Sequence, residues 1–140
     1  MAAAEPSASK IIRVVAALVV DKPQGRVLLV RKRGTRALMQ PGGKREPGES
    51  DLDALARELR EELGCEFESS GAVFLGLFTA QSANEPGHAV EAALYRIKLR
   101  QGVRPGGEIE EIVWVDPRNA GDFELAPLTR QFVLPLARAA

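Results

Sequence analysis

The segment that decides the fold, residues 43–65, reads GKREPGESDLDALARELREELGC. Leucine and alanine recur in its second half at helical spacing, which predicts a helix over residues 50–63 with one buried face. Ser50 stands before two acidic residues and suits an N-cap, and Gly64 suits a C-cap. Residues 34–49 hold four glycines and two prolines, so they form a predicted loop that leads into the helix.

Three carboxylates of this helix share one side. Glu58, Glu61 and Glu62 fall within an arc of roughly 100°, beside the apolar stripe. Like charges at that spacing repel by about 0.2–0.5 kcal/mol per pair. A divalent cation would offset this repulsion, and carboxylate oxygens suit Mg²⁺ or Mn²⁺. The alternative is a solvated acidic face paired with Arg57 and Arg60, and for an isolated Glu-Glu pair it would be favoured.

The residues around the helix favour the metal site. The segment runs Gly43, five residues, Glu49, seven residues, Arg57-Glu58-Leu59, one residue, Glu61-Glu62, one residue, Gly64-Cys65. This pattern resembles the Nudix box, the signature of the Nudix hydrolase family. It fixes nine positions over 23 residues, which makes it more specific than a lone glycine-rich loop. Cys65 departs from the usual aliphatic residue, but cysteine also behaves as a small buried hydrophobe.

The resemblance implies an α/β (α+β) fold, a Nudix-type α/β/α sandwich whose mixed sheet is flanked by helices. It also implies metal-dependent hydrolysis of a diphosphate bond in a nucleoside triphosphate or a nucleoside diphosphate derivative. The cofactor would be Mg²⁺ or Mn²⁺. The resemblance implies that Glu58, Glu61 and Glu62 are metal ligands. A backbone carbonyl of the paired glycines, that of Gly43 or alternatively Gly42, would be a further ligand.

The resemblance also implies a supporting role for two residues of the box. Glu49 would hold Arg57, and Arg57 would in turn orient the carboxylates through ion pairs. The general base could be a carboxylate of the box, either Glu58 or Glu61.

The base could instead lie outside the box. Glu108, Glu110 and Glu111 stand just before a predicted strand, where several family members place a functional glutamate. Spacing to the segment 119–123 favours Glu111, which would serve as a catalytic residue and a metal ligand. The alternative, a solvated acidic loop, has about equal weight because three neighbouring glutamates make any single assignment fragile.

Cations near the box are candidates to hold substrate phosphates. Arg31, Arg33 and Lys44 are the predicted phosphate ligands, although strand alternation should turn only one or two cations inward. Two departures argue against the oxidised guanine substrates of the best-known family members. Gln40 replaces an aromatic residue before Pro-Gly-Gly, and residues 126–128 lack an asparagine that would read the base.

The remaining elements complete a mixed α/β domain. Residues 11–20 and 26–33 are predicted strands that form a hairpin around a Pro-Gly turn. Further strands are predicted at 73–80, 89–100 and 109–116. A closing helix is predicted at 125–139, where Pro135 kinks or ends it.

Length and composition set the remaining expectations. The 140 residues predict a single domain at 11–140 after a flexible tail at 1–10. Equal numbers of acidic and basic residues argue against a nucleic-acid partner. No apolar run is long enough to span a membrane. A single cysteine excludes an intramolecular disulfide, so a cytoplasmic location is expected. The partner is expected to be a small nucleotide, and a homodimer is possible because family members often dimerise.

Two other function classes compete with hydrolysis. A nucleotide-sensing binding module of the same fold would bind without turnover, but such modules usually lose box carboxylates, and none is lost here. A prenyl-diphosphate isomerase is disfavoured, because Cys65 ends the box helix and is not positioned for proton transfer.

Overall fold

The computed structural model describes residues 10–140 of the chain. The predicted tail at 1–10 therefore lies outside the described residues, except for Lys10. The elements follow in this order: β1 (Ile11–Leu18), β2 (Val27–Lys32), β3 (Gly42–Gly43), α1 (Asp51–Leu63), η2 (Ser69–Gly71), β4 (Val73–Gln81), β5 (Ala89–Arg96), β6 (Ile109–Val115), η3 (Thr129–Val133) and α2 (Leu134–Ala139).

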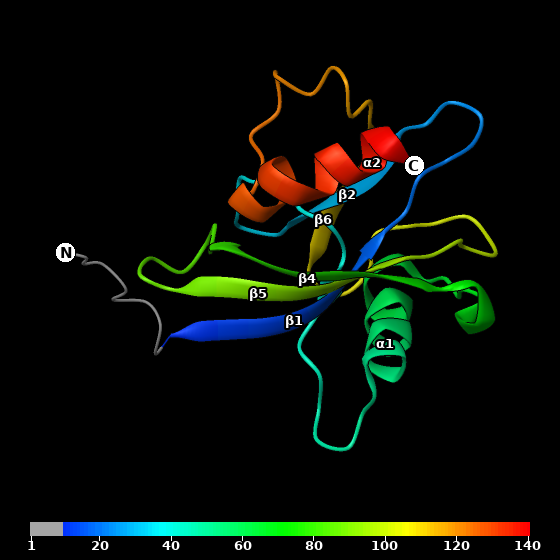
Figure 1. Cartoon of the computed structure of the whole chain (residues 1–140), viewed down its shortest axis with the longest axis horizontal. Helices are drawn as coiled ribbons and strands as arrows, with labels where there is room; N and C mark the ends of the chain where they lie inside the picture. The colour runs from blue at the N-terminus through cyan, green and yellow to red at the C-terminus, as the bar shows by residue number, and fades with distance from the viewer. Residues whose placement is uncertain (1–9) are drawn as a thin grey trace.

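The strands form two sheets. The larger one has the order β3-β1-β5-β4 and is mixed, because β1 and β5 run parallel while the other neighbours are antiparallel. The smaller one is the antiparallel pair of β2 and β6. Helices α1 and α2 lie on opposite sides of the larger sheet (Figure 1). The predicted α/β/α sandwich with a mixed sheet is thereby confirmed.

Strand β1 serves both layers because its side chains alternate across the sheet. Ala16 and Leu18 pack in the cluster that includes residues of η3 and α2. Val15 and Ala17 pack in the other cluster, with the leucines of α1. The apolar stripe of α1 is thus held against the sheet, and its carboxylates are held at the edge of this core.

The ends of helix α1 are closed as the sequence predicts. The Ser50 hydroxyl accepts a hydrogen bond from the Asp53 N–H at 3.1 Å. Gly64 adopts a left-handed conformation with φ of 63°, which a residue with a Cβ rarely adopts, and its N–H donates to the Arg60 carbonyl. The two caps fix where helix α1 begins and ends, and the apolar stripe fixes which of its sides faces the sheet.

The predicted hairpin of the first two strands is wrong. The turn exists, because the Asp21 N–H donates to the Arg26 carbonyl, but only one bridge, Val20 with Val27, joins the two arms. Strand β1 already has β3 on one edge and β5 on the other, so β2 finds no free edge there. It pairs with β6 instead and forms the second sheet.

Two element ends also differ from the predictions. Strand β5 ends at Arg96 instead of residue 100, at the point where its neighbour β1 ends at Leu18. The closing helix runs over 127–139 and continues through Pro135. A π turn, Thr129–Val133, precedes this proline, and the Leu134 N–H donates to the Thr129 carbonyl five residues back. No helix within residues 10–140 is long and apolar enough to cross a membrane.

Candidate active site

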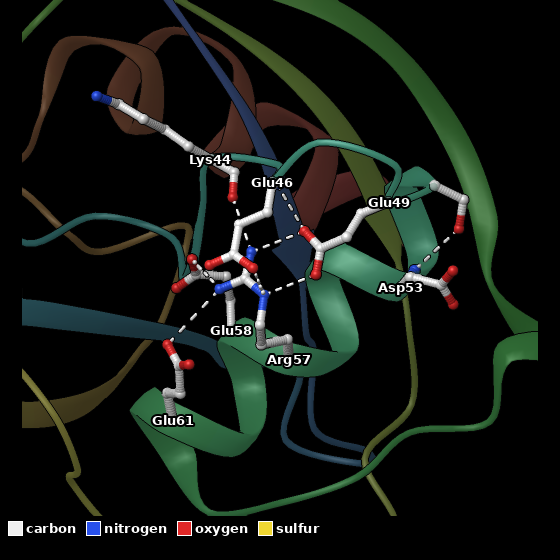
Figure 2. Close-up of polar contacts among 8 residues, drawn as sticks. Lys44, Glu46, Glu49, Asp53, Arg57, Glu58 and Glu61 are labelled. Atoms are coloured by element: carbon white, nitrogen blue, oxygen red, sulfur yellow. Dashed lines mark hydrogen bonds and ion pairs between the residues drawn. The ribbon is translucent and has the colours of Figure 1, made fainter.

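Arg57 is the centre of a polar network on helix α1 (Figure 2). Its Nε and Nη2 donate to the two oxygens of Glu49 at 2.7 and 2.9 Å, a two-pronged pair with good geometry. Its Nη1 donates to Glu58 at 3.1 Å and lies 3.8 Å from Glu61. Nη2 also reaches the carbonyl of Lys44 at 3.0 Å. One guanidinium therefore joins the loop before the helix to two box carboxylates.

The loop that carries Glu49 is closed on itself. The Glu46 N–H donates to the Glu49 carboxylate at 2.7 Å, and the Glu49 N–H donates to the Glu46 carbonyl at 3.0 Å. The hydrogen bonds from Arg57 and from the Glu46 N–H lower the pKa of Glu49 to about 2. The same contact raises the pKa of Arg57 above its already high value. Glu49 therefore holds Arg57 as a full ion pair at neutral pH.

Glu62 occupies a different environment from the other box carboxylates. Its side chain is buried, and its carboxylate accepts a hydrogen bond from the Gly42 N–H at 3.2 Å. Burial raises the pKa of Glu62 to about 8. The nearby carboxylates of Glu58 and Glu108 add to the rise, while the Gly42 N–H and Lys32 oppose it. Because burial and two neighbouring carboxylates disfavour the charged form of Glu62, a positive charge placed beside it would be stabilising.

The paired glycines of the box allow the close approach of backbone to carboxylate. A Cβ on Gly43 would lie 2.4 Å from the carboxylate carbon of Glu58, and a Cβ on Gly42 would lie 2.1 Å from the Val15 carbonyl oxygen. Gly42 also has a φ of +148°, a conformation that L-residues rarely adopt. A side chain at Gly43 would push the loop away from helix α1, and one at Gly42 would push it away from β1.

A cavity of about 350 Å³ lies beside this network. One end is charged, and its lining consists of Lys32, Gly43, Lys44, Glu58, Glu62 and Glu108. Apart from Glu85, the other end is lined by uncharged residues from β1, from residues 39–40, from the loop after β4 and from residues 126 and 128. Anionic and apolar parts of one ligand could therefore be bound together here.

The predicted residues outside helix α1 divide into two groups. Lys44 lines the cavity as a candidate phosphate ligand. Arg31 and Glu111 do not line it, because they face each other across β2 and β6 and form an ion pair at 2.7 Å. Arg33 is mostly exposed and lies 3.6 Å from Glu110. The structure thus does not bring Glu111 beside Glu58 and Glu62.

The comparisons with known proteins agree with this geometry. The model of the NUDIX domain matches residues 11–134. A CTP pyrophosphohydrolase of Escherichia coli is 33% identical over 123 residues, which cover 84% of this chain and 85% of the relative. A putative 8-oxo-dGTP diphosphatase 2 of Mycobacterium tuberculosis is 33% identical over 98 residues, covering 70% and 67%. The solution structure of the E. coli ORF135 protein is 30% identical with a TM-score of 0.68, and the match covers 96% of this chain and 91% of that one.

This chain belongs to the Nudix family. Its Nudix box spans the end of β3 and all of α1, and Cys65 follows the helix as a buried side chain. Burial also raises the pKa of the Cys65 thiol to about 11, so it fills the aliphatic position as an uncharged group.

Sequence reasoning did not select two cavity residues of this Nudix domain, Lys32 and Glu108. Lys32 lines the cavity with Val30, two residues before it on the same strand. Period-two alternation could therefore have favoured Lys32 over its neighbours Arg31 and Arg33. Glu108 is fixed by its carbonyl, which accepts the Arg33 N–H, and this contact between distant segments leaves no local pattern.

The residues of the Nudix box provide the type of ligand atom that a hard divalent cation prefers. Across residues 10–140, no three acidic, histidine or cysteine side chains already converge closely enough to hold a metal ion. The carboxylates instead contact donors of the protein: Glu58 and Glu61 share Arg57, and Glu62 accepts from the Gly42 N–H. The donors are all oxygens, and the buried Glu62 favours an added positive charge, so the set suits Mg²⁺ or Mn²⁺.

Proposed function

We propose that this chain hydrolyses a diphosphate bond of a nucleoside triphosphate, with Mg²⁺ or Mn²⁺ as cofactor. The observation that carries the proposal is the network in which Glu49 holds Arg57 and Arg57 holds Glu58, beside a cavity with lysines and carboxylates at one end. The relatives named as a CTP pyrophosphohydrolase and a putative 8-oxo-dGTP diphosphatase support this bond class.

The cation would be held by Glu58, Glu61, Glu62 and the carbonyl of Gly43. When bound, it would neutralise phosphate charge and lower the pKa of a coordinated water. Arg57 keeps the Glu58 carboxylate in place, and Glu49 in turn keeps Arg57 in place.

Two lysines are positioned to bind the substrate phosphates. Lys32 and Lys44 line the charged end of the cavity and have no ion-pair partner within residues 10–140. Ammonium groups at this end would attract a chain of phosphates against the negative box carboxylates. Arg31 and Arg33, which pair with Glu111 and Glu110, are less suited to this role.

The general base is best assigned to Glu108. It lines the cavity near Glu62, whereas Glu111 is paired with Arg31 and Glu58 is paired with Arg57. In the proposed step, Glu108 takes a proton from water, the water oxygen bonds to phosphorus, and the bond from that phosphorus to the bridging oxygen breaks. The products are a shortened nucleotide and phosphate or pyrophosphate.

The test of the bond class is a panel of nucleoside triphosphates and nucleotide sugars, assayed with Mg²⁺ and with Mn²⁺ for released phosphate and pyrophosphate. CTP comes first because of the named relative. The double variant Glu61→Gln with Glu62→Gln should abolish the activity, and Glu110→Gln is the matched control outside the cavity. Turnover that survives the double variant would refute the proposal, and tight binding without turnover under either metal would favour a binding module.

A second set of variants tests the base. Glu108→Gln should lower kcat by about 10²–10⁴-fold, the usual contribution of a general base, while Glu111→Gln should change it only slightly. The reverse order of effects would return the assignment to Glu111.

The setting of the reaction is also part of the proposal. A single free cysteine supports a cytoplasmic protein that acts on free nucleotides, with no nucleic acid or membrane as partner. A homodimer and a single domain over 11–140 remain proposals, which sedimentation and limited proteolysis would check.

A further inference from the structure

A further hollow of about 950 Å³, called the basic pocket below, opens where β1 and β5 end. The two strands run parallel and finish side by side at Leu18 and Arg96, and the residues that follow each of them line the pocket. The cavity beside helix α1 draws instead on earlier residues of β1, such as Ile12 and Val14, and shares no lining residue with the basic pocket. Small-molecule sites usually measure about 300–1,000 Å³, so the basic pocket has the size of a separate ligand site.

One wall of the basic pocket is apolar. Its members all pack in the core cluster beneath helix α1, and they are Ile97, Leu99, Val103 and Trp114. Trp114 is only partly buried, so part of the indole remains accessible from the pocket. A flat group of a ligand would remove apolar surface from water if it lay against this wall.

The remainder of the basic pocket is rich in positive charge. Three cationic side chains line it, and all of them are exposed: Lys22, Arg96 and Lys98. None of the three forms an ion pair within residues 10–140. Asp21 is the acidic side chain of the lining, and Arg26 already pairs with it at 2.8 Å. The cations outnumber the acidic groups even when the terminal carboxylate of Ala140 is counted, although the whole chain has no net charge.

The uncharged polar side chains of the basic pocket add hydrogen-bond donors. The Gln101 Oε1 accepts from the Glu66 N–H at 3.4 Å, which leaves its amide nitrogen to donate. The Trp114 Nε1–H has no side-chain partner in the described part of the chain, and no buried side-chain nitrogen or oxygen there lacks one, so this N–H is accessible. An indole N–H can only donate. The side chains of the pocket therefore suit a ligand with negative charge and acceptor oxygens.

We propose that the basic pocket binds a phosphorylated compound with a flat ring, such as a nucleotide, at a site separate from the hydrolytic one. The phosphates would lie among Lys22, Arg96 and Lys98, and the ring would lie against the apolar wall. This inference goes beyond the proposed hydrolysis, because no residue of the Nudix box lines the pocket. Binding should therefore need no divalent cation.

Trp114 reports on this site directly, because it is the only tryptophan of the chain. The experiment titrates ADP into the protein without divalent cations, so that no hydrolysis takes place, and follows the fluorescence of Trp114. The fluorescence should change to saturation, and higher ionic strength should raise the Kd, because salt screens charges at an exposed site. Calorimetry repeats the titration, and the absence of saturable binding of ADP at millimolar concentration would refute the proposal.

Two smaller compounds test the class of ligand. Pyrophosphate lacks the ring, and adenosine lacks the phosphates. Each should bind at least about tenfold more weakly than ADP, because burial of a ring and charge-assisted hydrogen bonds each contribute that much. Pyrophosphate that binds as tightly as ADP would refute the role of the apolar wall, and adenosine that does so would refute the role of the cations.

The cations are tested by a double variant. Arg96→Gln with Lys98→Gln should raise the Kd for ADP by about tenfold, since an exposed charge pair contributes up to about fivefold. Arg96→Lys with Lys98→Arg keeps the charges and should keep the Kd close to that of the unmodified protein. Arg33→Gln with Arg36→Gln is the matched control, because it removes two cations outside the lining.

A further variant separates the two binding places. Lys44 lines the cavity beside helix α1 and not the basic pocket, so Lys44→Gln should leave the titration unchanged. If Lys44→Gln weakens ADP binding while Arg96→Gln with Lys98→Gln does not, ADP binds in the cavity of the Nudix box and the separate site is refuted. A protein that binds ADP as expected but hydrolyses no nucleotide would keep this site and lose the proposed function.

Discussion

The two ends of the cavity are built in different ways. At the charged end, the principal contacts of the box lie close together in the sequence, as in the pairs of Glu49 with Arg57 and of Gly42 with Glu62. At the uncharged end, Gln40 meets Thr129 across 89 positions of sequence. The Glu49–Arg57 network is thus local in sequence, whereas Lys32, Glu108 and the Gln40–Thr129 pair reach the cavity only through the tertiary fold. Substitutions in the local network and in the tertiary contacts should therefore have effects of different size.

Among the substitutions that test this comparison, the largest effect is expected within the local network. Arg57→Lys keeps the charge but loses the two-pronged contact with Glu49 and the reach to Glu58, so kcat should fall by about 10–100-fold. Arg60→Lys, whose residue forms only an exposed pair with Glu66, is the matched control. Arg60→Lys should leave kcat close to that of the unmodified protein. An equal loss of kcat in both variants would mean that the contact with Glu49 does not support turnover.

A smaller effect is expected where the start of helix α1 meets the sheet. The Tyr95 hydroxyl donates to Asp51 at 2.7 Å and links β5 to the first turn of α1. Burial and this hydrogen bond raise the pKa of Tyr95 to about 12, so the hydroxyl stays protonated. Tyr95→Phe should lower the free energy of unfolding by about 1 kcal/mol in chemical denaturation, with kcat close to normal. A large loss of kcat would show that the box depends on distant support.

The smallest effect should appear in the dependence of stability on pH. The folded-state pKa of Glu49 is about 2, below its ordinary value of 4.5, so its contribution is present above that ordinary value and is lost as the pH falls towards 2. The melting temperature of Glu49→Gln should therefore lie below that of the unmodified protein at pH 6, and the gap should narrow between pH 4.5 and 2. A gap that is constant over this range would mean that Glu49 is not held by charge.

The difference between contacts that are local in sequence and contacts that form only in the tertiary fold also explains what could be predicted from the sequence. Helix α1, its two caps and the Glu49–Arg57 contact depend on residues less than a few turns apart, and the pattern of the box predicts them. The pairing of β2 with β6 depends on which strand edges remain free after β1 has bound β3 and β5. A linear pattern does not contain that competition, so the hairpin prediction was wrong.

The residues around the cavity follow the same reasoning. Three neighbouring glutamates precede β6, and only their position relative to β2 and α1 separates Glu108, which lines the cavity, from Glu111, which pairs with Arg31. In the sequence, Gln40 stands out only because it replaces an aromatic residue. Its contact with Thr129 required the closing helix to be placed, and no local signal predicts that contact.

The segment before β6 has a consequence for insertions and deletions in this chain. The Arg104 N–H donates to the Leu63 carbonyl and the Gly106 N–H to the Glu62 carbonyl, so the segment is fastened to the last turn of α1. A Cβ on Gly106 would lie 2.6 Å from the Glu61 carbonyl oxygen. Extra residues between Gln101 and Gly102, both of which are exposed, would extend a surface loop. One extra residue between 104 and 108 would move Glu108 relative to helix α1. The length of this short segment is therefore fixed by the need to place Glu108 in the cavity.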